Sequence, residues 1–294
     1  MSLTDPTEPI DPAGRPGRPA GRTGPPRVTA AGPGWGAARG VTEPASPARL
    51  YDYLLGGKDN YAADRELAGR LLTVQPELVT SARENRAFLT RAVALLAHRG
   101  VRQFLDLGCG LPTRDNVHQV AARHATGARV VYVDHDPTVL AHARALLADD
   151  GNVAVVQSDL RKQEELLGDV ARGGVLDWDE PVAVLLTAVL HFLPDADDPA
   201  RIVGGLRGLM SSGSALVLSH ATGDASPAAS QIVELFSGAC VAPLALRGRD
   251  EIRAFFGDLE LLDPGLVVTA AWRPGERALP PPHGQLLAGV GVRA

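Results

Sequence analysis

Residues 103–110 read Gln-Phe-Leu-Asp-Leu-Gly-Cys-Gly, an apolar run that ends in a Gly-x-Gly turn. A second apolar run, Val-Val-Tyr-Val-Asp at 130–134, ends in the acidic residue Asp134. Glycines let a backbone approach a ligand closely, and a carboxylate at the end of the next strand accepts hydrogen bonds from ribose hydroxyls. Together the two runs predict a doubly wound α/β domain with a Rossmann-like sheet that binds an adenosine-containing cofactor.

Around these runs, apolar segments alternate with segments of helical periodicity. Strands are expected at 102–107, 129–134, 153–157, 182–187 and 214–219. Helices are expected at 78–99, 115–124, 137–148, 199–210 and 226–240. Because the expected strands are almost continuously apolar, they are typical of a parallel sheet that is covered on both faces. The apolar segments 259–271 and 285–292 predict a final pair of strands, one of them antiparallel.

The composition of the 294-residue chain fits one globular domain with a tail, since 45% of the residues are hydrophobic and 21% are charged. Residues 1–44 are rich in proline and glycine and lack apolar periodicity, which predicts a disordered tail. We expect a helical cap at 45–100 and the cofactor-binding core at 101–294.

Charge and cysteine content narrow the functional class. A formal net charge of −5 and an aromatic content of 4% disfavour nucleic acid as a partner. No apolar run reaches the ~18 residues of a membrane span, and the N-terminus lacks the apolar core of a signal peptide. Cys109 and Cys240 offer neither a disulfide framework nor metal-ligand spacing, so a reduced, cytoplasmic setting is expected.

Residues 52–64 read Asp-Tyr-Leu-Leu-Gly-Gly-Lys-Asp-Asn-Tyr-Ala-Ala-Asp and combine aromatic, glycine and polar residues. A glycine turn that carries exposed polar groups is typical of a functional loop. The alternative interpretation is a connection between two helices, with Gly56 and Gly57 at the C-terminal cap of the first helix.

The loop after Gly110 distinguishes two kinds of adenosine cofactor. A nicotinamide dinucleotide fold needs a third glycine in the Gly-x-Gly-x-x-Gly pattern, and Thr113 stands there, preceded by Pro112. The phosphate-binding Walker loop is also absent from the sequence. A dinucleotide is therefore disfavoured relative to a cofactor that has adenosine but no phosphates.

S-adenosylmethionine meets this description. Carboxylates can accept hydrogen bonds from its ribose diol and its adenine amino group, and they attract its sulfonium cation. The ends of the first four expected strands, which meet in one crevice, supply such residues: Asp106; Asp134 and His135; Asp159 and Leu160; and Thr187. The competing interpretation of each acid is a cap for the following helix. We prefer the cap for Asp136, which precedes Pro137.

This series resembles the class I S-adenosylmethionine-dependent methyltransferases in Leu-Asp-Leu-Gly-Cys-Gly at 105–110, Tyr-Val-Asp at 132–134 and Ser-Asp-Leu at 158–160. More narrowly, the span from Ser46 to the C-terminus resembles an actinobacterial S-adenosyl methyltransferase family known mainly from genomes. The segments that carry this resemblance are Ser-Pro-Ala-Arg at 46–49, Tyr-Asp-Tyr-Leu-Leu-Gly-Gly-Lys-Asp-Asn at 51–60, Asn-Arg at 85–86, Gly-Leu-Pro-Thr at 110–113, Val-Leu-His-Phe at 189–192 and Leu-Ser-His-Ala at 218–221.

The resemblance implies a class I methyltransferase sheet of seven strands, with an antiparallel strand in the last pair, and an N-terminal helical cap. It also implies S-adenosyl-L-methionine as methyl donor, with S-adenosyl-L-homocysteine as product. The wider class has a third glycine where Pro112 stands, so the loop near the methionine part of the cofactor departs from the class pattern. The expected methyl acceptor is a small molecule.

Two histidines follow expected strands at the crevice. His191, after the fourth strand, is the first candidate for a general base or for positioning the acceptor, and packing in a helical turn is its alternative role. A base is needed only if the acceptor must lose a proton. His220, after the fifth strand, is the second candidate.

The N-terminal segments predict a lid made by Tyr53, Gly57, Lys58, Asn60 and Tyr61. A positive group there would pair with the cofactor's methionine carboxylate, and we hypothesise Arg86 or Lys58 in that role. Residues 226–256 are expected to shape the acceptor pocket.

Two other functions stay open from the sequence. A catalytically silent regulator that binds S-adenosylmethionine would carry the same motifs, because a binding motif does not prove turnover. An NAD(P)-dependent oxidoreductase is disfavoured by the missing third glycine. The oligomeric state is also open, with a homodimer as one alternative.

Overall fold

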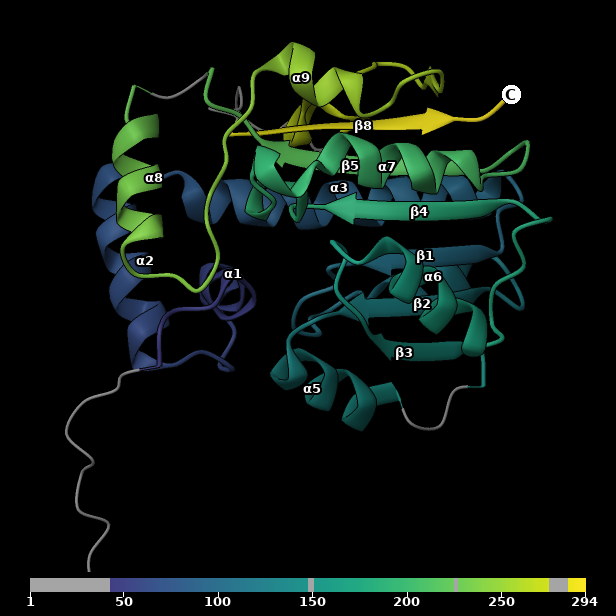
Figure 1. Ribbon diagram of the computed structural model, residues 1–294, viewed down its shortest axis with the longest axis horizontal. Helices are drawn as coiled ribbons and strands as arrows, with labels where there is room; N and C mark the ends of the chain where they lie inside the picture. The colour runs from purple at the N-terminus through teal and green to yellow at the C-terminus, as the bar shows by residue number, and fades with distance from the viewer. Residues whose placement is uncertain (1–42, 148–150, 225–226, 275–284) are drawn as a thin grey trace, which may run out of the picture. The chain divides into compact units, whose positions relative to one another are not determined.

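The frame of the domain is one sheet whose strands follow the order β3-β2-β1-β4-β5-β8-β6 (Figure 1). The computed structural model describes residues 43–147, 151–224, 227–274 and 285–294. The parallel strands are those predicted: β1 (Gln103–Leu107), β2 (Arg129–Asp134), β3 (Val153–Gln157), β4 (Val182–Thr187) and β5 (Ala215–Ala221). Because the strand order reverses between β1 and β4, the loops that follow these two strands diverge and leave room for a ligand.

The sheet has eight strands in the described part of the chain, so the predicted count of seven is wrong by one. β8 (Leu286–Val292) is antiparallel to β5, as expected for the last pair. Two short strands, β6 (Glu260–Leu261) and β7 (Val267–Val268), both pair with β8. They lie where a single strand was expected. A turn through Pro264 separates them, because proline lacks the N–H that a ladder needs.

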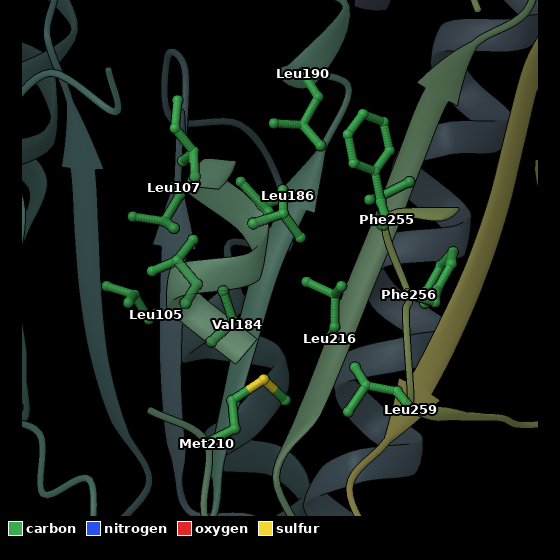
Figure 2. Close-up of a cluster of buried hydrophobic side chains, with 14 of the residues drawn as sticks. Leu105, Leu107, Val184, Leu186, Leu190, Met210, Leu216, Phe255, Phe256 and Leu259 are labelled. Carbon is green, nitrogen blue, oxygen red and sulfur yellow. The ribbon is translucent and has the colours of Figure 1, made fainter. Parts of the chain in front are cut away.

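Helices cover both faces of the sheet, and the elements that do so are α3 (Leu78–His98), α4 (Val117–His124), α5 (Pro137–Leu147), α6 (Gln163–Arg172), α7 (Pro199–Gly208) and α9 (Arg249–Ala254). Successive side chains of a strand point to opposite faces, so each face has its own core. On one face, Leu105 and Leu186 pack with α6, α7 and α9, and Figure 2 shows them with Phe255 and Phe256. On the other face, Phe104 packs with α3 and α4.

The predicted helices α3, α4, α5 and α7 are present with ends shifted by a few residues, and residue 148 lies outside the described ranges. The prediction that Asp136 caps α5 is confirmed, since its Oδ1 accepts the N–H of Thr138 (2.8 Å). α8 (Ala229–Ser237) fills the middle of the helix predicted at 226–240. α6 and α9 were not predicted, because α6 begins with a polar run and α9 has only six residues.

Two helices, α1 (Pro47–Leu55) and α2 (Ala62–Val74), form the N-terminal cap. Segment 52–64 is therefore the end of α1, a turn and the start of α2. Gly56 ends α1 in the left-handed conformation (φ +82°), so the helix-connection interpretation is the correct one for this turn. The expected tail at 1–44 lies outside the described residues except for its last two.

Buried carboxylates fix the cap. Asp52 Oδ2 accepts the N–H of Asp59 (2.9 Å) and the side-chain amide of Asn60 (2.8 Å). Asp64, fully buried, accepts the N–H of Ser46 (2.9 Å) and Nε of Arg49 (2.8 Å). A buried charge is tolerated when donors surround it, so these two acids hold both ends of the turn region in place.

The cap packs against α8, which lies beside α2 in Figure 1. Leu50 of α1, Leu71 of α2, and Ile232 and Phe236 of α8 belong to one buried hydrophobic cluster. Ala45 adds a backbone bridge to Cys240. No helix in the described ranges is long and apolar enough to span a membrane.

Replacing Gly57 by Ala should destabilise the protein by roughly 1–3 kcal/mol, the scale of losing buried hydrogen bonds. A Cβ at this position would overlap the Asp52 carboxylate and displace it from its two donors. Gly69→Ala in α2 is the control, since a Cβ there meets open space and helix propensity favours alanine. Urea unfolding measures both, and equal stabilities for the two variants would contradict this account.

Candidate functional site

A cavity of about 410 Å³ lies where the carboxyl ends of β1–β4 face the cap helices and α8. Its size falls within the usual range for small-molecule sites. Of the predicted cofactor-site residues, the structure brings these to the cavity wall: Arg86, Asp106, Gly108, Gly110, Asp134, His135, Asp159, Leu160 and Thr187. His191 lines it as well.

Two physical constraints explain why glycines occupy the turn after β1. Gly108 and Gly110 both have positive φ, +70° and +64°. A Cβ on Gly108 would also overlap the side chain of Val189, in the turn after β4. The N–H of Gly108 donates to Val133 O (2.8 Å), which ties the turn to β2.

Asp134 joins this turn to the start of α5. Its Oδ2 accepts the N–H of Gly110 (3.0 Å), and its Oδ1 accepts the N–H of Asp136 (3.0 Å). Burial raises the pKa of Asp134, and these two backbone donors oppose the rise. Each carboxylate oxygen keeps a further lone pair for a ligand. His135 is exposed beside it, with Nδ1 3.5 Å from Asp134 Oδ1.

Asp106 is buried at the end of β1 and lines the cavity. Burial raises its pKa to about 7; the nearby Arg86 opposes the rise, and the negative charge of Asp134 adds to it. The described residues place no hydrogen-bond donor on its carboxylate. A ligand that brings a donor or a positive charge would therefore complete this group.

Arg86 of α3 holds the loop that follows the glycine turn. Its Nη2 donates to the carbonyls of Asp115 (2.8 Å) and Arg114 (3.3 Å), while its buried Nε has no protein partner. Asn116 closes this loop by accepting the N–H of Thr113 (3.0 Å) through Oδ1. The longer loop at Pro112 is thus fixed by side chains in place of a third glycine.

Asp159 is already paired within the chain. Arg161 donates to it through Nε (2.9 Å) and Nη2 (2.6 Å), and this pair is the main reason why the pKa of Asp159 is lowered. The arginine side chain is half exposed, so the pair lies at the rim of the cavity. A ligand amino group at Asp159 would compete with Arg161.

A buried hydrogen-bond chain connects the cap to the end of β4. Asn85 Nδ2 donates to the hydroxyl of Tyr51 (2.9 Å), and Ser219 donates to Asn85 Oδ1 (2.6 Å). Ser219 Oγ in turn accepts the N–H of Ala188 (2.9 Å), which has φ +54° next to Thr187. A non-glycine residue in the left-handed backbone region is strained, and the hydrogen bond from Ala188 to Ser219 holds it in that conformation. None of these hydrogen bonds was predicted from the sequence. The feature that could have indicated them is Asn85, a polar residue on the apolar face of α3.

His191 is buried in a short turn at Leu190–Phe192. Its Nδ1 accepts the N–H of Ala221 (3.2 Å), so the imidazole proton lies on Nε2. Burial lowers the pKa of His191 well below its usual value, and His220 and Arg247 add to the effect. His191 is therefore a neutral hydrogen-bond donor in this state, and its Nε2 is not free to accept a proton.

His220 lies behind His191 and does not line the cavity. Its two nitrogens contact Ala221 O (2.7 Å) and Nη1 of the buried Arg247 (2.9 Å), and burial lowers its pKa to about 4. Arg247 also donates to the carbonyls of Leu190 (3.2 Å) and Leu193 (2.9 Å). Sequence reasoning missed this arginine, which clamps the turn that carries His191.

The residues predicted to form the lid do not reach the cavity wall: Tyr53, Gly57, Lys58, Asn60 and Tyr61. Tyr53 packs in the cap cluster, and Lys58 is exposed on the α1–α2 turn. Gly57 donates its N–H to the carbonyl of Asp52, and Asn60 donates its side-chain amide to the Asp52 carboxylate. The Tyr61 ring lies under Arg49. Within the described ranges, no group of three or more metal-ligating side chains occurs.

Five parallel strands with antiparallel β8 beside β5, a glycine turn after β1 and an acid at the end of β2 define a class I methyltransferase domain. The chain belongs to the S-adenosyl methyltransferase family, whose model matches residues 35–294. It is an S-adenosylmethionine-dependent methyltransferase by family, with S-adenosyl-L-methionine as its cofactor.

Two solved structures are similar over most of their length. A candidate methyltransferase from Thermobifida fusca is 42% identical, with a TM-score of 0.80, and the match covers 85% of this chain and 95% of that one. A DUF574 family protein from Streptomyces avermitilis is 36% identical, with a TM-score of 0.81, over 86% of this chain and 99% of that one. No curated protein sequence matches the chain.

Replacing Asp106 by Asn should flatten the pH dependence of stability. The raised pKa of Asp106 means that the folded chain holds a proton that the unfolded chain releases between about pH 4 and pH 7. Wild-type stability should fall as pH rises through this window, so Asp106→Asn should be more stable by roughly 2–4 kcal/mol at pH 8 and similar at pH 4.

Urea unfolding between pH 4 and pH 8 measures this difference. Glu260→Gln, at an exposed position of β6, is the control that should track the wild type. Parallel stability curves for wild type and Asp106→Asn would show that Asp106 is not held in the acid form.

Proposed function

We propose that this protein transfers a methyl group from S-adenosylmethionine to a small molecule. The observation that carries the proposal is a single cavity that joins the acidic strand ends to an apolar wall from the cap and α8. The cavity of about 410 Å³ would hold donor and acceptor together, which favours an acceptor of small size. The two free cysteines suit the cytoplasm as the proposed setting.

Asp134 would accept hydrogen bonds from the ribose hydroxyls of the cofactor, since it lines the cavity and each of its carboxylate oxygens keeps a further lone pair. Gly108 and Gly110 would let the backbone approach the ligand. Asp159 and Leu160 would lie against adenine, with Arg161 displaced from the carboxylate or shared with it. His135 and Thr187 would complete the rim of this half.

The charged end of the cofactor would lie between Asp106 and Arg86. Asp106 would meet the ammonium group. The positive charge of that group favours the ionised form of the Asp106 carboxyl, whose pKa is raised by burial to about 7. Arg86, which lines the cavity, would meet the carboxylate with its guanidinium. We assign this role to Arg86 rather than Lys58, because Lys58 does not line the cavity.

S-adenosylmethionine supplies a methyl group that is already activated on a sulfonium sulfur, so the protein's task is to orient the acceptor in a dry site. His191 would contribute a hydrogen bond from Nε2 to position the acceptor. The hydrogen bond from Ala221 keeps Nδ1 unprotonated and disfavours His191 as a general base. Arg247 would act on this step as a positioning residue through the His191 turn.

Methyl transfer is tested with methyl-labelled S-adenosylmethionine and a small-molecule extract of the cells that make the protein. We expect label to enter the small-molecule fraction only when the protein is present, and Asp134→Ala to abolish the incorporation. If the protein binds S-adenosylhomocysteine but transfers no label, the result favours a silent regulator and contradicts the proposal.

Arg86→Glu should weaken binding of S-adenosylhomocysteine by tenfold or more, or about 1.4 kcal/mol, because it replaces attraction with repulsion at the carboxylate. Lys58→Glu carries the same charge change at a position outside the cavity and should stay within about twofold of wild type. Isothermal titration calorimetry measures both, after circular dichroism has verified the fold. Unchanged affinity in Arg86→Glu would exclude Arg86 from the site.

A further inference from the structure

The cavity has a second half that donor binding does not explain. Seven side chains of one hydrophobic cluster line it: Leu50, Leu71, Leu78, Phe192, Ile232, Phe236 and Leu244. They come from α1, α2, the start of α3, the turn after β4, and α8 with its following loop. We call this surface the cap–α8 wall. Its rings of Phe192 and Phe236 lie nearly parallel, 5.6 Å apart.

The wall offers no partner for an anion. Among the described residues, the arginines at the cavity are Arg86 and Arg161, and both lie at the strand-end half. Arg86 is bound to the carbonyl of Asp115, and Arg161 to the carboxylate of Asp159. A carboxylate or phosphate against the wall would lose its water without gaining a counter-charge.

The wall also offers little to a cation. Asp52 of α1 lines the cavity, but its Oδ2 already accepts hydrogen bonds from Asp59 and Asn60 in the α1–α2 turn. The other acids at the cavity stand at or just after the strand ends, where donor binding is proposed. An uncharged apolar ligand therefore suits the wall best, because burying it needs no compensating charge.

One polar side chain lies where this wall meets the strand ends. His191 is adjacent to Phe192, with ring centroids 4.4 Å apart, and it lines the same cavity. Its Nδ1 is held by the N–H of Ala221, which leaves the proton on Nε2 for a ligand atom with a lone pair. The Nε2–H of His191 thus places a neutral donor beside the apolar surface.

We infer that the methyl acceptor is an uncharged, largely apolar small molecule. Its body lies against Phe192, Ile232 and Phe236, and an oxygen or nitrogen lone pair on it accepts the Nε2–H of His191. This inference rests on the proposed function, since it names the substrate class of the same site.

Four naphthalene probes of similar shape test the inference: 2-naphthol, naphthalene, 2-naphthoate and 2-naphthylmethylammonium. Each is titrated by calorimetry at pH 7 into the full chain saturated with S-adenosylhomocysteine. We expect 2-naphthol to bind at least about tenfold more tightly than either charged probe, because the wall cannot compensate their lost hydration.

Two pairs of variants separate the role of the donor from that of the wall. His191→Phe should remove the preference for 2-naphthol over naphthalene, whereas His191→Gln, which keeps a donor near the position of Nε2, should retain most of it. Ile232→Lys on the wall should favour 2-naphthoate. Gln231→Lys, on the exposed side of the same helix, should not.

Equal or tighter binding of a charged probe to the wild-type chain would overturn the inference, as would failure of 2-naphthol to bind a chain that binds S-adenosylhomocysteine. Failure of the proposed function is seen separately, either as failure of S-adenosylhomocysteine itself to bind or as binding without transfer of label from methyl-labelled S-adenosylmethionine. In that case the inference about the acceptor fails with it.

Discussion

The carboxylate of Asp134 is the interaction on which the site depends. One side chain accepts the amides of Gly110 and Asp136, and so fixes the glycine turn after β1 against the start of α5. The parallel strands require this kind of connection, because their carboxyl ends meet at one edge and their loops have no ladder to order them. The first glycine of the turn, Gly108, brings the turn against Val189 and so couples β1 to β4.

The cap helices and α8 form the side of the cavity that faces the strand ends. α1 and α2 are fixed by buried carboxylates and share a hydrophobic cluster with α8, so the cavity is bounded by an ordered structure rather than by a polar loop. A hydrogen-bond chain through Asn85 and Ser219 joins this cap to the strained Ala188 at the end of β4. The cavity therefore has an acidic half made by the sheet and an apolar half made by the cap and α8.

The sequence was sufficient for features that depend on local patterns. Continuous apolar runs predicted all five parallel strands, and the Asp136-Pro137 pair predicted the start of α5. Features that depend on distant partners could not be predicted in this way. Asn85 and Ser219 are 134 positions apart, and the clamp of Arg247 on Leu190 spans 57. Nor could the sequence distinguish Lys58 from Arg86, because only the packing of α1 and α3 decides which of them reaches the cavity.

We propose that the acidic half of the cavity holds the methyl donor and that the apolar half holds its acceptor. The most direct measurement is a crystal structure of the full chain with S-adenosylhomocysteine. We expect ribose hydroxyls within about 3 Å of Asp134 and a sulfur atom that faces the space between His191 and the cap–α8 wall. A ribose bound away from Asp134, or a sulfur directed away from His191, would contradict it.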